Sequence, residues 1–104
     1  MTASLTLIAA DGSETADPEP AQIAAAVRAL TIDNWFVILE RFEDTFLQVA
    51  VKADHFALER RAGGDETQEG TSVGTLDEVV TTFQAYARQD PAWASPFTWA
   101  RVKL

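Results

Sequence analysis

Cysteine is absent from this 104-residue sequence, and histidine occurs once, at position 55. A chain without cysteine has neither disulfides nor thiolate metal ligands, and it fits a reducing compartment. One histidine without a second histidine or a cysteine does not make a typical zinc or transition-metal site. We therefore predict no metal site and no cofactor, and we expect His55 to be an exposed residue at a strand end.

Positive charge is also scarce. The sequence has 8 lysines and arginines against 16 aspartates and glutamates, which gives a net charge of −8 at neutral pH. Nucleic acids and anionic membranes attract basic proteins, so this balance argues against both as partners. Two interpretations stay open: the charge keeps the protein soluble, which is its more common role, or it steers the chain toward a basic protein.

Long apolar runs are lacking as well. The first ten residues contain no lysine or arginine, and their apolar stretch is too short to cross a bilayer. We find no targeting signal there and predict a cytoplasmic protein. A chain of 104 residues without an internal repeat is typical of one domain, so we expect residues 1–104 to form a single unit.

What the sequence does have is regular alternation and helical spacing. A weakly alternating run at 4–10 predicts a first strand, and the acidic, proline-containing residues 11–20 predict an exposed loop. Apolar residues spaced three and four apart predict a helix over about 19–30. Three runs rich in β-branched and aromatic residues then follow with short connections, which predicts an antiparallel meander. These runs are 35–41, 45–52 and 55–62.

The remainder of the chain predicts a polar strand, a helix and a final strand. Residues 66–73 are polar enough for an exposed sheet edge. Thr75 with Glu78 three residues later is the capping-box pattern of a helix start, and Asp90 before a proline ends that helix. Alternation over 97–103 predicts the last strand. The order favours an α+β fold, a mainly antiparallel sheet of about five strands with two helices packed on one face.

Alternation also sorts the meander into two faces. In the run 45–52, one face is apolar and the other carries polar side chains. The run 35–41 is apolar on both faces, so we expect it to be central, or covered on its second face by the N-terminal segment or a partner. Glu40 and Glu59 are placed to share a face. Cross-strand ion pairs with nearby arginines explain them more simply than acid–base catalysis.

No catalytic pattern is present in the sequence. Phosphate-binding loops, dinucleotide fingerprints, nucleophile elbows and EF-hand spacing are all absent. We therefore predict a protein that is not an enzyme and has no catalytic residues. Acidic residues in two turn regions are a solvated surface by default, and a docking site for basic residues is the alternative. The partner-binding candidates are Asp65, Glu66, Glu69, Glu43 and Asp44, together with Trp93.

Trp93 lies in a proline-flanked loop at 90–96. An aromatic side chain there is suited to anchor a partner, because tryptophan is enriched at interface hot spots. The competing interpretation is that Trp93 pins its loop to the body of the domain.

From Asn34 onward, the pattern resembles the small immunity proteins that accompany bacterial polymorphic toxins. The resembling features are the WFVILER strand, the hairpin FLQVAVKADHFALERRAGG, the amphipathic segment TLDEVVTTFQAYARQDPAW and the final FTWARVKL. The resemblance implies a bacterial, cytoplasmic protein that binds a cognate toxin domain and blocks it. The acidic surface would suit a basic toxin of the nuclease type.

These observations leave three hypotheses. The first is a non-enzymatic acidic binding protein that neutralises a cognate toxin domain. The second is a homodimeric structural or regulatory module, because a polar edge strand and a doubly apolar strand both suit self-association. The third is a small-molecule binder or minor enzyme, with a pocket between the sheet and the Trp93 loop.

Overall fold

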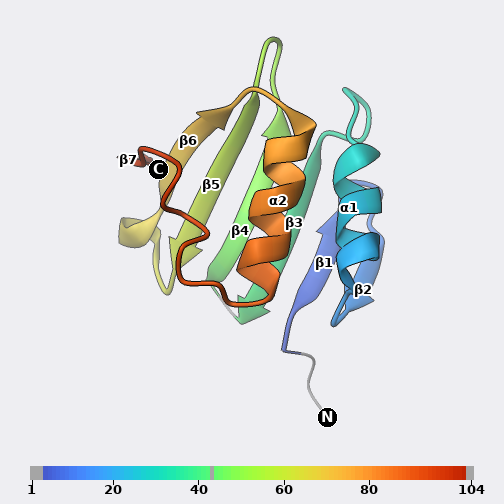
Figure 1. Ribbon diagram of the computed structural model, residues 1–104, viewed down its shortest axis with the longest axis horizontal. Helices are drawn as coiled ribbons and strands as arrows, with labels where there is room; N and C mark the ends of the chain where they lie inside the picture. The colour runs from blue at the N-terminus through green and yellow to red at the C-terminus, as the bar shows by residue number, and fades with distance from the viewer. Residues whose placement is uncertain (1–3, 43, 103–104) are drawn as a thin grey trace.

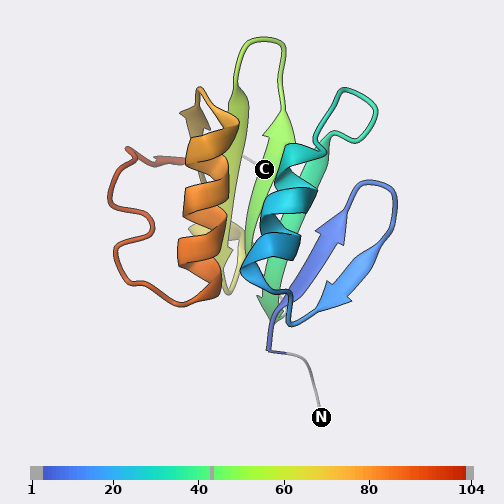
Figure 2. The same ribbon diagram turned by 45° about the vertical axis from the view of Figure 1, so that its right-hand side comes forward.

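A computed structural model describes residues 4–42 and 44–102, without the side chain of Asp65. Seven strands form one antiparallel sheet in the order β2-β1-β3-β4-β5-β6-β7, and both helices lie on one of its faces (Figures 1 and 2). This is the predicted α+β class, with two more strands than expected. The strands are β1 (Thr6–Ala9), β2 (Glu14–Ala16), β3 (Phe36–Phe42), β4 (Thr45–Val51), β5 (Phe56–Ala62), β6 (Glu69–Val73) and β7 (Ala100–Arg101). The helices are α1 (Pro20–Arg28) and α2 (Leu76–Ala87), with a 3-10 turn, η1 (Asp65–Thr67).

The strand β2 corrects the prediction that 11–20 is only a loop. Its residues pair with β1, Glu14 opposite Ile8 and Ala16 opposite Thr6. The sequence ETA contains one β-branched residue and no apolar alternation, so it carries no strand signal of its own. β2 therefore forms because its backbone pairs with the open edge of β1, and it becomes one edge of the sheet.

The other edge also differs from expectation. Of the described residues 97–102 in the predicted strand 97–103, Ala100 and Arg101 form β7 and pair with β6, opposite Gly70 and Glu69. The aromatic side chains before them pack against the core instead, which draws that part of the chain away from the ladder. The predicted edge strand at 66–73 is thus β6, and its first two residues are covered by β7.

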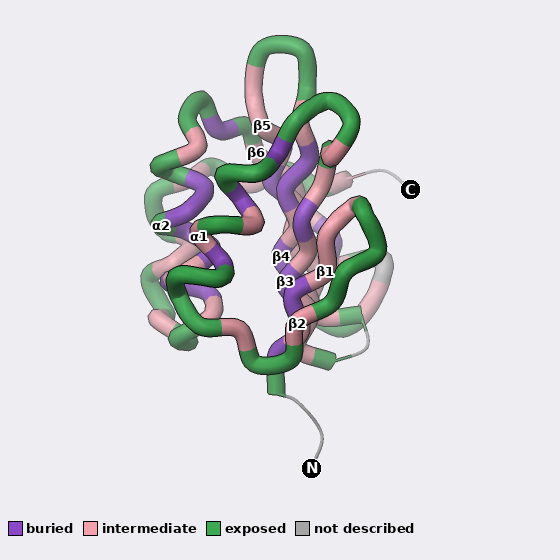
Figure 3. The backbone as a smooth tube through the Cα atoms, turned by 90° about the vertical axis from the view of Figure 1, so that its right-hand side faces the viewer, coloured by how far each residue is buried: buried purple, intermediate pink, exposed green. Residues whose placement is uncertain are grey.

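The core lies between the sheet and the helices. Alternate residues of the central strands face the helices and are fully buried, and they meet an equally buried stripe on each helix (Figure 3). We call this side of the sheet the covered face. Its fully buried side chains are Val37, Leu39, Leu47, Val49 and Leu58 from the strands, with Ile23 and Val27 from α1 and Val79 and Phe83 from α2.

The helix ends follow the capping patterns in the sequence. Thr75 begins α2 by accepting a hydrogen bond from the backbone N–H of Glu78, at 3.2 Å. At the other end, Gln89 has a left-handed φ of 60°, and the N–H of Asp90 reaches back to the carbonyl of Ala85 at 3.0 Å. This is a Schellman motif with glutamine where glycine is usual. Neither described helix has the length and apolarity that a membrane span requires.

Candidate functional site

The second face of the sheet carries neither helix (Figures 2 and 3), and we call it the open face. Ile38 of β3 lies opposite Ile8 of β1, and Phe36 lies opposite Ala50 of β4. Ala57 of β5 extends this row. These five side chains form an apolar patch, which explains why the sequence of β3 is apolar on both sides. No helix or strand of residues 4–42 and 44–102 packs over the patch as α1 and α2 pack over the covered face.

Trp35 enlarges the apolar patch at one end. Its ring contacts the ring of Phe36 edge-on, with the centroids 4.8 Å apart, and the residue is 49% exposed. A large aromatic residue that is half open to solvent beside an apolar sheet surface is the kind of side chain that anchors protein interfaces.

Three carboxylates surround the patch. Glu14 on β2, Glu40 on β3 and Glu59 on β5 all take the open-face positions of their strands. Glu40 and Glu59 share a face as predicted, but the expected ion pairs with arginine are absent among the described side chains. Arg41 and Arg60 lie in the opposite phase, and Arg61, which shares the phase of Glu59, bonds to Asp44 and Gln68 instead. Glu59 instead accepts long hydrogen bonds from Gln48 at 3.4 Å and Gln68 at 3.3 Å.

The β3–β4 turn, which holds Asp44, and the β5–β6 loop, which holds Glu66, lie at the same end of the sheet (Figure 1). The N–H of Gly63 donates to the carbonyl of Asp44 at 2.8 Å, which ties the two segments together. Glu66 is exposed. Glu43 lies outside the described residues, and so does the side chain of Asp65.

The described carboxylates at this end are partly neutralised. Asp44 pairs with Arg61 at 3.1 Å, and Glu69 pairs with Arg60 at 2.7 Å. A carboxylate already paired with arginine offers little further attraction to a basic partner. The two turns are therefore neighbours in space, as a shared docking site requires, but they carry less free negative charge than the sequence suggested.

A cleft of about 420 Å³ opens on the covered face at the same end. Its lining includes Arg41, Arg60, Glu69, Tyr86 and Trp93, and we call it the arginine cleft. The Arg60 guanidinium lies 5.6 Å from the Trp93 ring centroid, while Trp93 meets Tyr86 edge-on at 5.0 Å. Trp93 is half-buried in this cluster, so it both holds its loop to the body and forms a wall of the cleft.

Sequence reasoning did not identify Arg41 and Arg60, two of the three arginines that line this cleft. The signal was present, since Arg41 continues the buried phase of Val37 and Leu39, and Arg60 continues the phase of Leu58. A charged residue in the buried phase of a strand needs a partner or a cavity.

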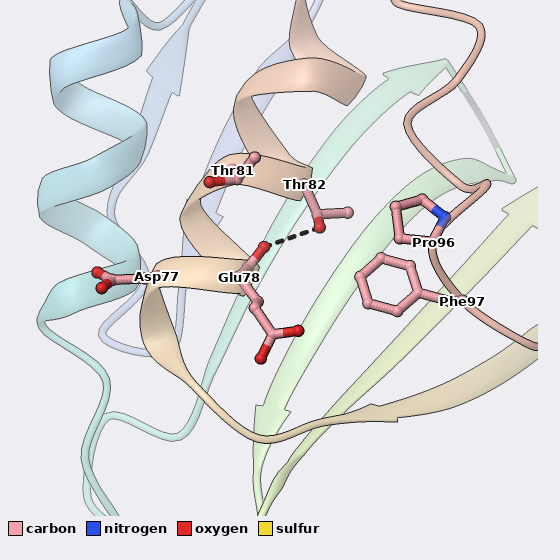
Figure 4. A pocket seen from close by; sticks show the side chains of 6 residues that line it. All are labelled: Asp77, Glu78, Thr81, Thr82, Pro96 and Phe97. Carbon is pink, nitrogen blue, oxygen red and sulfur yellow. Dashed lines mark hydrogen bonds between the residues drawn. The ribbon is translucent and has the colours of Figure 1, made fainter.

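A shallower apolar groove of about 250 Å³ lies between α2 and the segment that holds Pro96 and Phe97 (Figure 4). Thr82 closes its helix side, and its hydroxyl donates to the carbonyl of Glu78 at 2.8 Å. The carboxylate of Asp77 points away from Phe97 and pairs with Arg28 at 2.7 Å. No nucleophile and base face each other across this groove.

His55 is bonded to its neighbour Asp54 at 2.7 Å, at the β4–β5 turn. Hydrogen bonding and charge from His55 lower the pKa of the Asp54 carboxyl. Within residues 4–42 and 44–102, no three acidic or histidine side chains are grouped to hold a metal ion.

In comparisons with protein-family models, with curated proteins and with solved structures, none was found that matches this chain. The likeness to immunity proteins therefore stays a prediction.

Proposed function

We propose that this protein is a non-enzymatic binding domain that engages a basic protein through its open face. The observation that carries the proposal is the apolar patch of β1, β3, β4 and β5 with Glu14, Glu40 and Glu59 around it. None of these three carboxylates forms an ion pair with a described lysine or arginine. An apolar centre with a charged rim is the usual layout of a protein interface.

The charge of the chain supports a basic partner. With a net charge of −8, the protein attracts positively charged surfaces over a distance, and such steering raises association rates roughly 10- to 1000-fold in favourable cases. Lysine or arginine side chains of the partner would pair with the open-face carboxylates once Ile38 and Phe36 are covered. The partner class we propose is a toxin domain of the nuclease type, which the protein neutralises by occupying its basic surface.

The first experiment uses the whole chain as bait in a lysate of its source organism, at low and at moderate salt, with retained proteins identified by mass spectrometry. The decisive comparison is between two double variants with equal changes in charge. Glu14→Lys with Glu40→Lys alters the open face, whereas Asp33→Lys with Glu66→Lys alters exposed loops elsewhere. Circular dichroism checks that both remain folded.

A single basic protein held by the wild type and the loop variant, and lost by the open-face variant, supports the proposal. The purified pair should then bind with an affinity that falls as salt rises. Retention by the open-face variant with loss by the loop variant would move the contact to the turn end and overturn the open-face assignment. Absence of any basic protein at both salt concentrations would overturn the partner class.

A homodimer is the second candidate, and one observation favours it. Since β7 covers only Glu69 and Gly70, the outer edge of Thr71–Val73 has no described strand beside it. A second copy adding there would extend the sheet. The like charge of two copies opposes this contact, so we expect a monomer at low salt, and sedimentation velocity over a range of concentrations measures it.

A further inference from the structure

We infer that the arginine cleft binds a small organic monocarboxylate with an aromatic or apolar body. Arg41, Arg60, Tyr86 and Trp93 line this site from the covered face, and Phe46 lines it from an open-face position of β4, opposite Glu40. None of the five side chains of the apolar patch lines it, so the inference does not depend on the proposed protein interface. The inference rests on three features of the cleft: an arginine without a carboxylate partner, a negative border that limits the charge of the ligand, and aromatic walls.

Arg41 is the central residue. Its Nη2 donates to the carbonyls of Tyr86 and Ala87, the latter at 3.4 Å, at the C-terminal end of α2. Its guanidinium lies 4.9 Å from the Tyr86 ring centroid, and no described carboxylate pairs with it. A half-buried guanidinium without a carboxylate partner can bind the two oxygens of an incoming carboxylate.

Arg41 differs from the other two arginines of the cleft because those two are already paired with carboxylates. Arg60 is bound through Nε and Nη2 to Glu69, at 3.1 and 2.7 Å, and its guanidinium lies 4.4 Å from the Trp99 ring centroid. Arg61 bonds to Asp44 at 3.1 Å. An incoming anion would therefore compete with an existing carboxylate at either residue, whereas at Arg41 it would meet no such competitor.

The border of the cleft disfavours ligands with more than one negative charge. Glu69 is already paired with Arg60, whereas the C-terminal end of α2 places the negative pole of the helix dipole beside Arg41. A phosphate dianion would be repelled by this pole more strongly than a monoanion. A monocarboxylate matches the single uncompensated charge of Arg41.

The walls suit a planar or apolar body. Tyr86 and Trp93 meet edge-on at 5.0 Å, and Phe46 and Thr45 complete the apolar side of the lining. A volume of about 420 Å³ falls in the lower part of the range of small-molecule sites. A ligand with one ring and one carboxylate is of this size.

The test uses benzoate as the probe, its neutral analogue benzamide, and inorganic phosphate, each titrated into the full-length, isotope-labelled protein. The readout is the three indole N–H signals in the NMR spectrum, one for each tryptophan. We expect benzoate to shift the signals of Trp93 and Trp99. Trp35 precedes β3 at the opposite end from Arg41, so its signal is the internal reference. Benzoate should bind about 10-fold more tightly than benzamide, and phosphate should not displace it.

Two matched variants assign the effect to Arg41. Arg41→Gln should remove the preference for benzoate over benzamide, whereas Arg88→Gln, which removes an equal charge near the same helix end, should retain it. Equal binding of benzoate and benzamide, unchanged binding in Arg41→Gln, or no shift of Trp93 and Trp99 would each overturn the inference.

The result also separates this site from the protein interface. Glu14→Lys changes the open face on β2, which lines no part of the cleft, and it should bind benzoate as the wild type does. Failure of the benzoate test thus leaves the proposed partner interface standing, and failure of the lysate test leaves the cleft standing.

Discussion

Adjacent residues of β3 have opposite surroundings. Leu39 faces the helices and is fully buried, whereas Ile38 faces the open side and remains half-buried beside Ile8. The two residues are equally apolar, so composition does not distinguish them. What distinguishes the faces is the cover that α1 and α2 provide on one side. One strand thus stabilises the fold with one set of side chains and keeps a second set available for contact.

The largest expected effect on stability comes from shortening one apolar side chain on each face of β3. Leu39→Ala should lower the free energy of unfolding by about 2–5 kcal/mol, because it leaves a cavity in a closed core. Ile38→Ala should cost about 1 kcal/mol, since that side chain is only partly removed from water. Urea unfolding followed by circular dichroism measures both. Equal losses would mean that the open face is as well covered in solution as the core.

A smaller effect on the free energy of unfolding tests how far the stability of the fold depends on the N-cap of α2. Thr75→Ala removes the N-cap of that helix and should cost about 1 kcal/mol. Thr81→Ala, at an exposed position within the helix, is the control and should change stability by only a few tenths of a kcal/mol. Binding through the open face should not change in either variant. Equivalent unfolding midpoints for the two would contradict the capping role.

The smallest effect is a pH dependence at the arginine cleft. Burial raises the pKa of the Tyr86 hydroxyl above its usual 10.0, and the nearby positive charge of Arg41 opposes this. Between the unfolded and the folded pKa of Tyr86, the folded chain keeps a proton that the unfolded chain releases. The contribution of this protonated hydroxyl to the stability of the fold is complete below about pH 10, and it is lost as the pH rises through the folded pKa.

Tyr86 is the sole tyrosine, so tyrosinate absorbance reports it alone. We expect ionisation above the usual pKa in the folded protein and at the usual pKa in urea. In Tyr86→Phe, the fall of stability with alkaline pH should flatten. An ordinary pKa in the folded protein would indicate that the covered face is open to water at the cleft.

Much of this arrangement follows from local patterns. The cap at Thr75, the stripe of α1 and the alternation of β4 and β5 predicted both helices and the two faces of the meander. These features need only neighbouring residues, because helix caps and strand phase are local properties. The apolar residues on both faces of β3 also indicated that its second face is covered or contacts a partner.

The features that the sequence did not reveal depend on distant segments. β2 forms because β1 offers an unpaired edge, and β7 is short because Phe97 and Trp99 pack against the core. The arginine cleft joins Arg41 to the end of α2, 45 residues later. Alternation places Arg41 in the buried phase, but it does not show which helix end will lie above it.

The strand order has a consequence for how the chain is made. β2 folds back outside β1, β3 pairs with the other edge of β1, and from β4 onward each strand lies beside the strand formed before it. The sheet can therefore grow in one direction from β3 as residues leave the ribosome. Pairing with a recent neighbour closes short loops and favours rapid folding. Until α2 is synthesised, however, the cover that this helix provides on the covered face is missing. The nascent sheet then exposes apolar side chains on both of its faces, and the chain is therefore most prone to aggregate before Leu76–Ala87 emerges.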